Sequence, residues 1–260
     1  MQSWALVTGA TSGIGESFTR LLAENNYNIV LVARDLPRLQ ERADQLKTKF
    51  NVQTHIIQAD LATESGCSAV EQYIANNHVD VLINNAGFGI NKAFTVSQLA
   101  AEQQLLDVLV RTPMRLMHVA LPLMKQRNKG VVINVSSVAG FIAGGTYSAS
   151  KSYLTVLSES LHTELAGTNV KISALCPGFT RTEFHQRGRM SMKGLPNFLW
   201  LDSDELVAKA WNDALKGEAV SIPGWQYQLL VFVLKRLPRS IVRKVGMSVR
   251  KNNASNGHTF

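Results

Sequence analysis

The sequence predicts an α/β fold, a doubly wound parallel sheet of seven strands with helices on both faces. Short runs rich in β-branched residues alternate with segments of helical spacing, as in strands joined by right-handed helical crossovers. Several of these runs are apolar almost throughout, which is typical of strands buried on both faces. A length of 260 residues with 45% hydrophobic content suits one core, so we expect residues 1–260 to form a single domain.

The elements follow from these patterns in chain order. The seven predicted strands are residues 4–8, 28–33, 52–58, 79–84, 131–136, 170–176 and 219–222. The segments with helical spacing or composition are residues 13–25, 36–49, 63–77, 97–127, 148–166 and 203–216. Pro37 suits the first turn of the second helix, and Asp202 with Glu205 resembles a capping box at the start of the last.

Residues 179–201 show neither period and contain Gly, Pro, Met and aromatic residues. A segment of this length after a strand is more often a mobile functional loop than a plain connection. We therefore assign it as a candidate binding loop.

The net charge of +8 is concentrated in a basic C-terminal extension, residues 223–260. No acidic residue follows Glu218, and the lysines and arginines after it contribute +7, which leaves +1 for residues 1–218. Residues 227–251 combine an apolar run with basic residues. Core packing with a solvated basic face is favoured there over a helix pair at the mouth of a cleft or an amphipathic surface on anionic lipid. Because no recognised module accompanies the charge, we expect no nucleic-acid partner.

The cysteines and histidines predict no metal site. Cys67 and Cys176 are too few for a disulfide framework and lie near no second Cys or His at metal-ligand spacing. The six histidines form no compact pair, so structural or surface roles are favoured for them. Strand-like sequence from Trp4 leaves no room for a signal peptide, and no apolar stretch approaches the roughly 20 residues that span a bilayer. We expect a protein of the reducing cytoplasm.

A glycine-rich turn joins the first strand to the first helix. Gly9 permits the tight turn, Gly13 lets the backbone approach a pyrophosphate, and Gly15 lets the helix pack closely on the sheet. The helix N-terminus adds free N–H groups and a positive dipole for an anion. The spacing is G-x-x-x-G-x-G, so this motif indicates nucleotide binding more weakly than G-x-G-x-x-G does.

Taken with the later motifs, this turn resembles the short-chain dehydrogenase/reductase superfamily. The motifs occur in the family's order: Thr-Gly-x-x-x-Gly-x-Gly at 8–15, Ala-Asp at 59–60, Asn-Asn-Ala-Gly at 84–87, Ser-Ser at 136–137, Tyr-x-x-x-Lys at 147–151 and Pro-Gly at 177–178. The resemblance extends from residue 4 to about residue 182 and implies a Rossmann-type fold. It implies cofactor contacts at Gly9, Thr11, Ser12, Gly13, Ile14, Gly15, Asp60, Leu61, Asn85, Ala86, Gly87, Tyr147, Lys151, Pro177, Gly178 and Thr180. By the same resemblance, Asp60 and Leu61 flank the adenine, and Pro177, Gly178 and Thr180 form the wall on the nicotinamide side. Asn84 is expected to tie neighbouring strands.

The end of the second strand favours NADP(H). An acidic side chain there would accept from a ribose 2′-hydroxyl and repel a 2′-phosphate, but Ala33 is followed by Arg34, whose planar guanidinium can bind phosphate. Asp35 is expected to start the next helix, and Arg38 is a weaker second phosphate contact. The alternative for Arg34 is a solvated surface charge.

The Tyr-x-x-x-Lys motif predicts proton transfer to a carbonyl or from an alcohol. Residues four apart share a helix face, so the Lys151 ammonium is expected to favour the Tyr147 phenolate and lower the pKa of the phenol. The resemblance assigns Tyr147 as general acid/base, Lys151 as pKa modifier and nicotinamide-ribose ligand, and Ser137 as the residue that orients the substrate carbonyl. Ser137 precedes Tyr147 by fewer residues than in many members. We attribute this to a trimmed loop, with Ser136 as the alternative.

One residue departs from the family. Leu109 aligns with an asparagine of the family's catalytic tetrad, which supports a water chain leading to the lysine. Leucine cannot hold water. Proton exchange would then take another route, through Arg111, Thr112 or main-chain groups, or turnover is slowed, or the alignment is off by a turn.

These features predict a hydride-transferring oxidoreductase with an apolar or amphipathic ketone, aldehyde or 3-oxoacyl substrate. Residues 179–201 are then a substrate loop, with His185 a possible substrate contact; the alternative is a loop that only packs on the protein. Its apolar residues suggest a lid: Met190, Met192, Leu195, Phe198, Leu199 and Trp200. The alternative function is a catalytically weak nicotinamide-binding sensor or scaffold, and one form of this alternative attaches to a membrane surface through the basic extension. By resemblance we expect a homo-oligomer, a dimer or tetramer.

Overall fold

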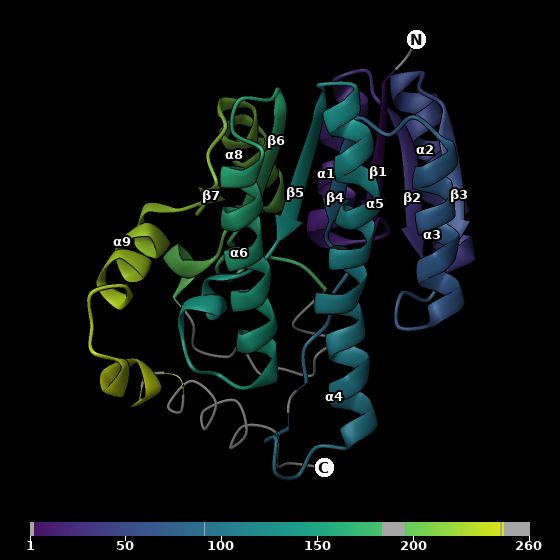
Figure 1. The fold of residues 1–260 in the computed structure, drawn as a ribbon. Helices are drawn as coiled ribbons and strands as arrows, with labels where there is room; N and C mark the ends of the chain where they lie inside the picture. The colour runs from purple at the N-terminus through teal and green to yellow at the C-terminus, as the bar shows by residue number, and fades with distance from the viewer. Residues whose placement is uncertain (1–2, 91, 184–195, 245, 247–260) are drawn as a thin grey trace.

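Seven parallel strands form one sheet in the part of the chain that the structure describes, a computed structural model covering residues 3–90, 92–183, 196–244 and 246 (Figure 1). The strands are Trp4–Thr8 (β1), Asn28–Ala33 (β2), Thr54–Gln58 (β3), Val81–Asn84 (β4), Gly130–Val135 (β5), Val170–Leu175 (β6) and Val220–Ser221 (β7). Their order across the sheet is β3-β2-β1-β4-β5-β6-β7, and every neighbouring pair is parallel. The predicted doubly wound sheet is confirmed.

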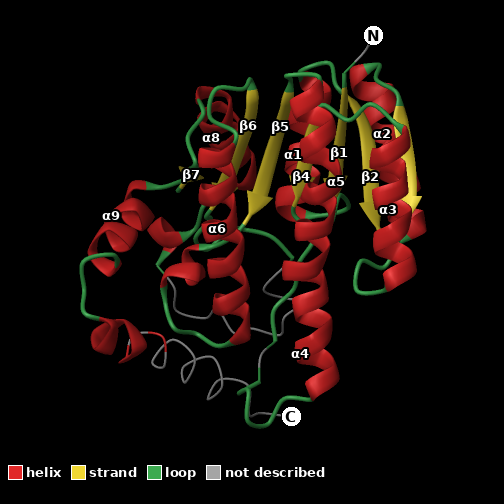
Figure 2. Ribbon diagram, in the orientation of Figure 1, coloured by secondary structure: helices red, strands yellow, loops and turns green. Residues whose placement is uncertain are grey.

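Helices cover both faces of this sheet (Figure 2). They are Gly13–Glu24 (α1), Leu36–Phe50 (α2), Glu64–Asn76 (α3), Leu99–Leu106 (α4), Thr112–Gln126 (α5), Thr146–Glu164 (α6), Ser203–Lys216 (α8) and Trp225–Leu234 (α9). The α1, α2 and α8 helices pack on one face, and α3, α5 and α6 on the other. Successive strand residues serve opposite faces: Val7 packs with the first group of helices and Leu6 with the second.

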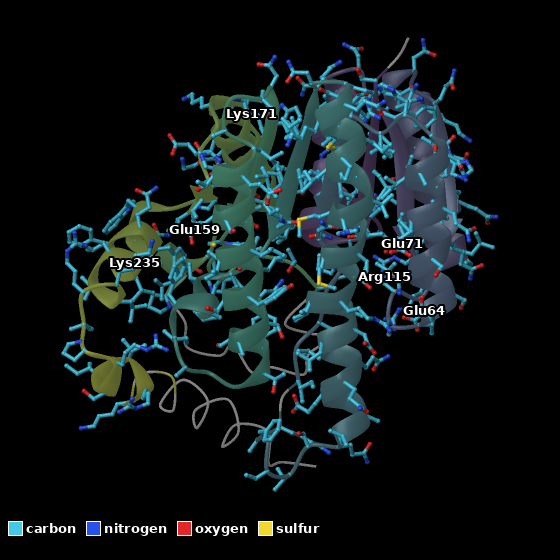
Figure 3. The ribbon with its side chains drawn as sticks, viewed as in Figure 1. Glu64, Glu71, Arg115, Glu159, Lys171 and Lys235 are labelled. Carbon is cyan, nitrogen blue, oxygen red and sulfur yellow. The ribbon has the colours of Figure 1, made fainter. Side chains whose placement is uncertain are left out.

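Ion pairs join α3 to α5, two of the helices that pack on the same face of the sheet. The Arg115 guanidinium on α5 lies between the carboxylates of Glu71 and Glu64 on α3 (Figure 3). Both acids raise the pKa of Arg115. Arg115 therefore helps to fix the two helices that follow β3 and β4.

The reversal of strand order between β1 and β4 positions the candidate site. Crossovers run in opposite directions on the two sides of this point, which opens a crevice at the carboxyl ends of the strands. The loops that follow β1, β4, β5 and β6 meet there. These loops carry the glycine, Asn-Asn-Ala-Gly, Ser-Ser and Pro-Gly motifs.

The long helix predicted over 97–127 is present as continuous helical backbone over residues 99–126, but it contains a π-helical turn that the sequence did not predict. Its two α-helices, α4 and α5, are joined by a π-helical turn, Asp107–Arg111. Pro113 has no N–H to donate to the carbonyl of Leu109, so one regular α-helical hydrogen bond is missing here. A π-helical turn holds one residue more than an α-helical turn, and it occurs where this bond is absent. The other predicted helices and strands are present with ends shifted by one or two residues.

The basic extension forms α9, and residues 239–244 are helical as well. The favoured interpretation of this segment as core is only partly correct, because Tyr227, Val231 and Leu234 are buried while five other apolar residues of α9 are exposed. No helix in the described ranges is both long and apolar enough to cross a membrane.

Candidate active site

The glycine turn after β1 is held in a shape that glycine alone adopts easily. Gly9 and Gly13 have φ of +66° and +56°. A Cβ on Gly15 would lie 2.2 Å from the Gly9 carbonyl oxygen, so α1 packs as closely on this turn as the sequence predicts. Ser12, the N-cap residue of α1, makes no side-chain capping bond, which leaves the first N–H groups of the helix available to an anion.

The Asn-Asn-Ala-Gly segment after β4 braces this turn. Thr8 Oγ1 accepts from the N–H groups of Asn85 and Ala86 at 2.9 and 3.0 Å, and Asn85 Nδ2 donates to the Thr8 carbonyl at 2.9 Å. Asn84 Nδ2 donates to Asn134 Oδ1 of β5 at 2.8 Å. Asn84 thus ties β4 to β5, as expected from the sequence.

Two arginines follow β2, and only the second of them forms an ion pair among the described residues. Arg34 is exposed directly after the strand and makes no ion pair within the described residues. Asp35 caps α2 by accepting from the Arg38 N–H at 3.1 Å, as predicted. The Arg38 guanidinium binds both carboxylate oxygens of Glu183 at 3.0 and 3.1 Å. Arg34 is therefore better placed than Arg38 to bind a phosphate.

Asp60 and Leu61 follow β3 at the same edge of the sheet. Asp60 Oδ1 accepts from the Ala62 N–H at 3.0 Å, and the Leu61 carbonyl accepts from Thr112 Oγ1 at 2.8 Å. A Cβ on Gly66 would lie 2.1 Å from the Asp60 carbonyl oxygen, so α3 packs directly on this loop. The predicted adenine-side segment is thereby held between α3 and α5.

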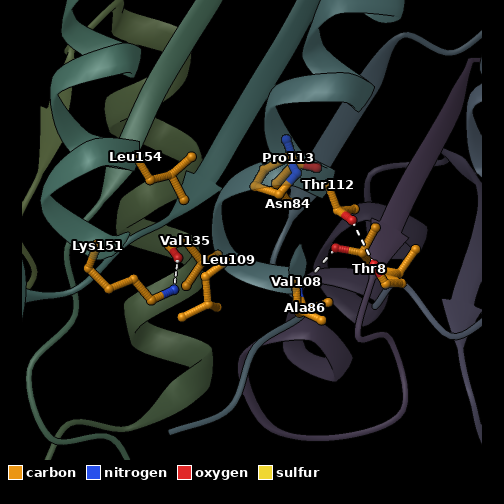
Figure 4. A pocket seen from close by; sticks show the side chains of 11 residues that line it. Thr8, Asn84, Ala86, Val108, Leu109, Thr112, Pro113, Val135, Lys151 and Leu154 are labelled. Carbon is orange, nitrogen blue, oxygen red and sulfur yellow. Dashed lines mark hydrogen bonds between the residues drawn. The ribbon is translucent and has the colours of Figure 1, made fainter. Parts of the chain in front are cut away.

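Ser137, Tyr147 and Lys151 come together at the carboxyl end of β5. The Ser137 hydroxyl lies close enough to the Tyr147 phenol for hydrogen bonding to lower the pKa of that phenol, and it also accepts from the Ala139 N–H at 3.1 Å. Lys151, one turn later on α6, is buried, and its Nζ donates to the Val135 carbonyl at 2.6 Å (Figure 4). The same Nζ lies 5.7 Å from the centre of the Tyr147 ring. The short loop before α6 therefore still allows Ser137 to reach Tyr147.

Ser136, the alternative serine, faces the other way. Its hydroxyl donates to the Lys151 carbonyl at 2.7 Å and lies 2.7 Å from Thr155 Oγ1. Both groups belong to α6, and Ser136 is buried beneath that helix. Its contacts fasten β5 to α6.

Burial controls the titration of both residues of the Tyr-x-x-x-Lys motif. It raises the pKa of Tyr147 to about 12, and the hydrogen bond with Ser137 acts in the opposite sense. Burial lowers the pKa of Lys151 to about 8. The prediction that Lys151 lowers the pKa of Tyr147 is wrong for this arrangement, because the ammonium is directed to the Val135 carbonyl and the ring face.

Leu109 occupies the space beside Lys151. It is buried in the π-helical turn, and a Cβ on Gly87 would lie 2.8 Å from Leu109 Cδ2 and 3.9 Å from Lys151 Nζ. A cavity of about 10 Å³, the size of a single water, is lined by Leu109, Lys151 and Asn84 (Figure 4). Asn84 Oδ1 has no hydrogen-bond partner among the described residues.

The two side chains proposed as alternative proton routes point away from Lys151. The Thr112 hydroxyl donates to Leu61, and the Arg111 guanidinium donates to the Ala62 carbonyl at 3.1 Å. Both are thus directed to the loop after β3. The position of Leu109 next to Lys151 fits the alignment with the family asparagine.

The Pro-Gly turn after β6 rests on a residue that the sequence did not single out. A Cβ on Gly178 would lie 2.0 Å from the Tyr227 ring of α9. The buried Tyr227 hydroxyl accepts from the Phe179 N–H at 3.0 Å and donates to the Leu199 carbonyl at 2.5 Å. Tyr227 therefore positions both ends of the proposed substrate loop. Its only signal in the sequence is a tyrosine within an apolar run.

The described ends of the loop lie side by side. The Arg181 N–H donates to the Leu201 carbonyl at 3.1 Å, Thr180 forms a β-bridge with Leu201, and Trp200 packs against Phe179. Phe198 is exposed. The remaining residues proposed for the lid or as a substrate contact lie outside the described residues: His185, Met190, Met192 and Leu195.

Comparisons with known proteins agree with this geometry. A profile of the short chain dehydrogenase family matches residues 3–192. An uncharacterized oxidoreductase of Staphylococcus epidermidis is 32% identical over 183 residues, which are 68% of this chain and 78% of that protein. A very-long-chain 3-oxoacyl-CoA reductase-like protein of Arabidopsis thaliana is 30% identical over 256 residues, 95% of this chain and 81% of that protein. A short-chain dehydrogenase from Sphingobium yanoikuyae, solved in complex with NADPH, has a TM-score of 0.82 and 29% identity, covering 91% of this chain and 96% of that one.

Proposed function

Because the chain belongs to the short-chain dehydrogenase family and is an oxidoreductase, we propose that it transfers a hydride between NADP(H) and an apolar ketone, aldehyde or 3-oxoacyl compound. The observation that carries this proposal is that Ser137, Tyr147 and Lys151 meet at the sheet edge that also holds the glycine turn. Relatives named as very-long-chain 3-oxoacyl-CoA reductases support an acyl substrate.

The residues at the sheet edge fit a dinucleotide. Gly9 and Gly13 hold a tight turn in which a Cβ would collide with Asn85 and Thr182, and the uncapped start of α1 offers N–H groups to the pyrophosphate. Arg34 would bind a 2′-phosphate, and Lys151 would bind the nicotinamide ribose. When bound, the reduced nicotinamide supplies the hydride.

The protein's own part in the reaction is to hold and protonate the substrate oxygen. Ser137 donates a hydrogen bond to this oxygen, and Tyr147 donates its phenolic proton as negative charge develops there. Since burial raises the pKa of Tyr147 to about 12, the phenol carries its proton at neutral pH. This protonation state favours carbonyl reduction over alcohol oxidation.

The Tyr147→Phe variant tests this assignment. We expect kcat for NADPH-dependent reduction to fall by about a hundredfold to ten-thousandfold, while NADPH binding by fluorescence titration stays within a few-fold of the wild type. Tyr153→Phe, an exposed tyrosine on the same helix, is the matched control and should leave kcat unchanged. Unchanged turnover in Tyr147→Phe would disprove the mechanism.

A nicotinamide-binding sensor is the second candidate, favoured by Leu109 packed beside Lys151 where a water chain would run. The same measurements separate the two functions. Titration of NADPH and NADH, followed by assays over aldehydes, ketones and 3-oxoacyl thioesters, distinguishes an enzyme that turns over from a protein that only binds.

A further inference from the structure

The α9 helix has apolar side chains on all sides but only one face packed against the protein. Tyr227 and Val231 lie on the buried face. On the opposite face, Trp225, Leu229 and Phe232 are 71%, 56% and 54% exposed, respectively. A helix that is apolar all round normally has both faces covered, and exposed apolar patches of this kind mark interaction sites. We call these three residues the α9 face.

Exposed cations surround the end of this helix. They are Lys235, Arg236, Arg239, Arg243 and Lys244. The Arg236 guanidinium lies 3.4 Å from the centre of the Phe232 ring, and Lys235 lies 5.3 Å from that of Phe141 (Figure 3). Because the sequence contains no acidic residue after Glu218, this positive charge is not offset within the segment.

We infer that the α9 face docks on the surface of an anionic phospholipid bilayer. Aromatic and leucine side chains of an interfacial helix enter the boundary between headgroups and acyl chains, and flanking lysines and arginines pair with lipid phosphates. Trp225, Leu229 and Phe232 would enter the boundary between headgroups and acyl chains. The five cations would pair with lipid phosphates. Figure 1 shows α9 at the edge of the molecule, beyond β7.

The charge distinguishes lipid from a second copy of this chain. Two α9 faces packed against each other would bring two sets of cations together, and like charges in contact oppose association. An anionic bilayer offers an apolar interior for the side chains of the α9 face and negatively charged headgroups for the cations. The inference does not depend on the proposed catalytic reaction.

Vesicle co-sedimentation of the full-length protein tests this docking, with a phosphatidylcholine vesicle compared with one of phosphatidylcholine and phosphatidylglycerol. We expect binding to the anionic vesicle only, weakening as salt is added. Leu229→Ser with Phe232→Ser should abolish sedimentation, and Arg239→Gln should weaken binding by about fivefold for the one cation removed. Leu215→Ser, an exposed leucine on α8, is the matched control and should bind like the wild type.

Two further readouts keep folding and catalysis separate from docking. Circular dichroism melting should be the same for the paired serine variant and the wild type, since both residues are exposed. Tyr147→Phe should bind vesicles normally even if it is inactive. The inference is overturned by absence of binding to anionic vesicles, by equal binding of the paired variant, or by light scattering in lipid-free buffer that shows this variant dissociating an oligomer.

Discussion

Arg34 directly follows β2 and Arg38 lies four residues later in the first turn of α2, yet only one of them is available to bind phosphate. Arg38 is held by both oxygens of Glu183, whereas Arg34 is exposed and makes no ion pair within the described residues. The 2′-phosphate of NADP(H) should therefore depend mainly on Arg34.

Arg34→Ala should raise KM for NADPH by about tenfold, the worth of one charge-assisted hydrogen bond at an exposed site, with little change for NADH. Arg38→Ala is the paired comparison and should have the smaller effect on NADPH. Initial-rate kinetics with both cofactors measure the difference. An equal effect of Arg34→Ala on both cofactors would remove its phosphate role.

Lys151 shows how a site residue can oppose folding. Burial lowers the pKa of its ammonium from 10.5 to about 8, so at pH 7 the folded protein holds a charge that it would more readily lose. Between pH 8 and 10.5 the unfolded chain binds more protons at this group than the folded chain does. The contribution of Lys151 to stability therefore rises with pH through this window.

Lys151→Met should increase the free energy of unfolding at pH 7, because the buried charge is removed. This advantage over the wild type should shrink as the pH rises from 8 towards 10.5, where the wild-type lysine also becomes neutral in the folded state. Urea unfolding at pH 7 and pH 9.5 measures both effects. A constant difference at the two pH values would contradict the lowered pKa.

Among the elements, α8 begins with the cap that its sequence predicts. Asp202 Oδ1 accepts from the N–H groups of Asp204 and Glu205 at 2.8 and 3.2 Å, and Asp204 in turn binds Ser17 and Arg20 of α1. The cap thereby supports a contact between helices distant in the sequence.

Asp202→Ala should cost about 1 kcal/mol of stability and lower Tm by about 2–4 °C, since two N–H groups lose their acceptor. Asp202→Asn keeps an acceptor oxygen and should recover most of the loss. Thermal unfolding followed by circular dichroism measures both variants. If the asparagine variant is as unstable as the alanine variant, the contribution of Asp202 is not capping.

Local patterns predicted the elements whose cause is local. Alternating β-branched runs located the strands, and Pro37, Asp35 and Asp202 located helix starts. The π-helical turn was missed because it depends on one absent N–H at Pro113 inside an otherwise helical pattern. A helix pair was only an alternative for the segment that forms α9, because the apolar residues of α9 lie on every side and no helical period separates a buried face from an exposed one.

For the candidate site too, the sequence predicted the local motifs but not the contacts between distant segments. The glycine, asparagine and Tyr-x-x-x-Lys motifs are contiguous, and parallel strands bring them to one edge. The direction of Lys151 and the support from Tyr227 depend on contacts between distant segments, which the sequence does not show.

At the scale of the whole molecule, a second exposed apolar surface lies on the side of the sheet opposite α8. Leu106 on α4, Met114 on α5, and Tyr153 and Val156 on α6 are all exposed there, and α4 contacts α6. Unlike the α9 face, the described part of α6 around Tyr153 and Val156 carries no exposed lysine or arginine that would oppose pairing. It is the better candidate for the homo-oligomer that the family resemblance implies.

Val156→Asp should therefore lower the mass of the protein measured by size-exclusion chromatography with light scattering. A buried pair of carboxylates at a symmetric contact is strongly unfavourable. The Leu229→Ser and Phe232→Ser pair on α9 should leave the mass unchanged. A wild type that is already monomeric would exclude this interface.

Tyr227 gives the two surfaces of α9 a thermodynamic connection. Its ring supports Gly178 at the proposed nicotinamide wall, while the other side of the same helix carries the lipid-docking face. Any coupling free energy between ligands bound on the two sides of this helix is reciprocal. The factor by which vesicles change the Kd for NADPH must therefore equal the factor by which NADPH changes the Kd for vesicles.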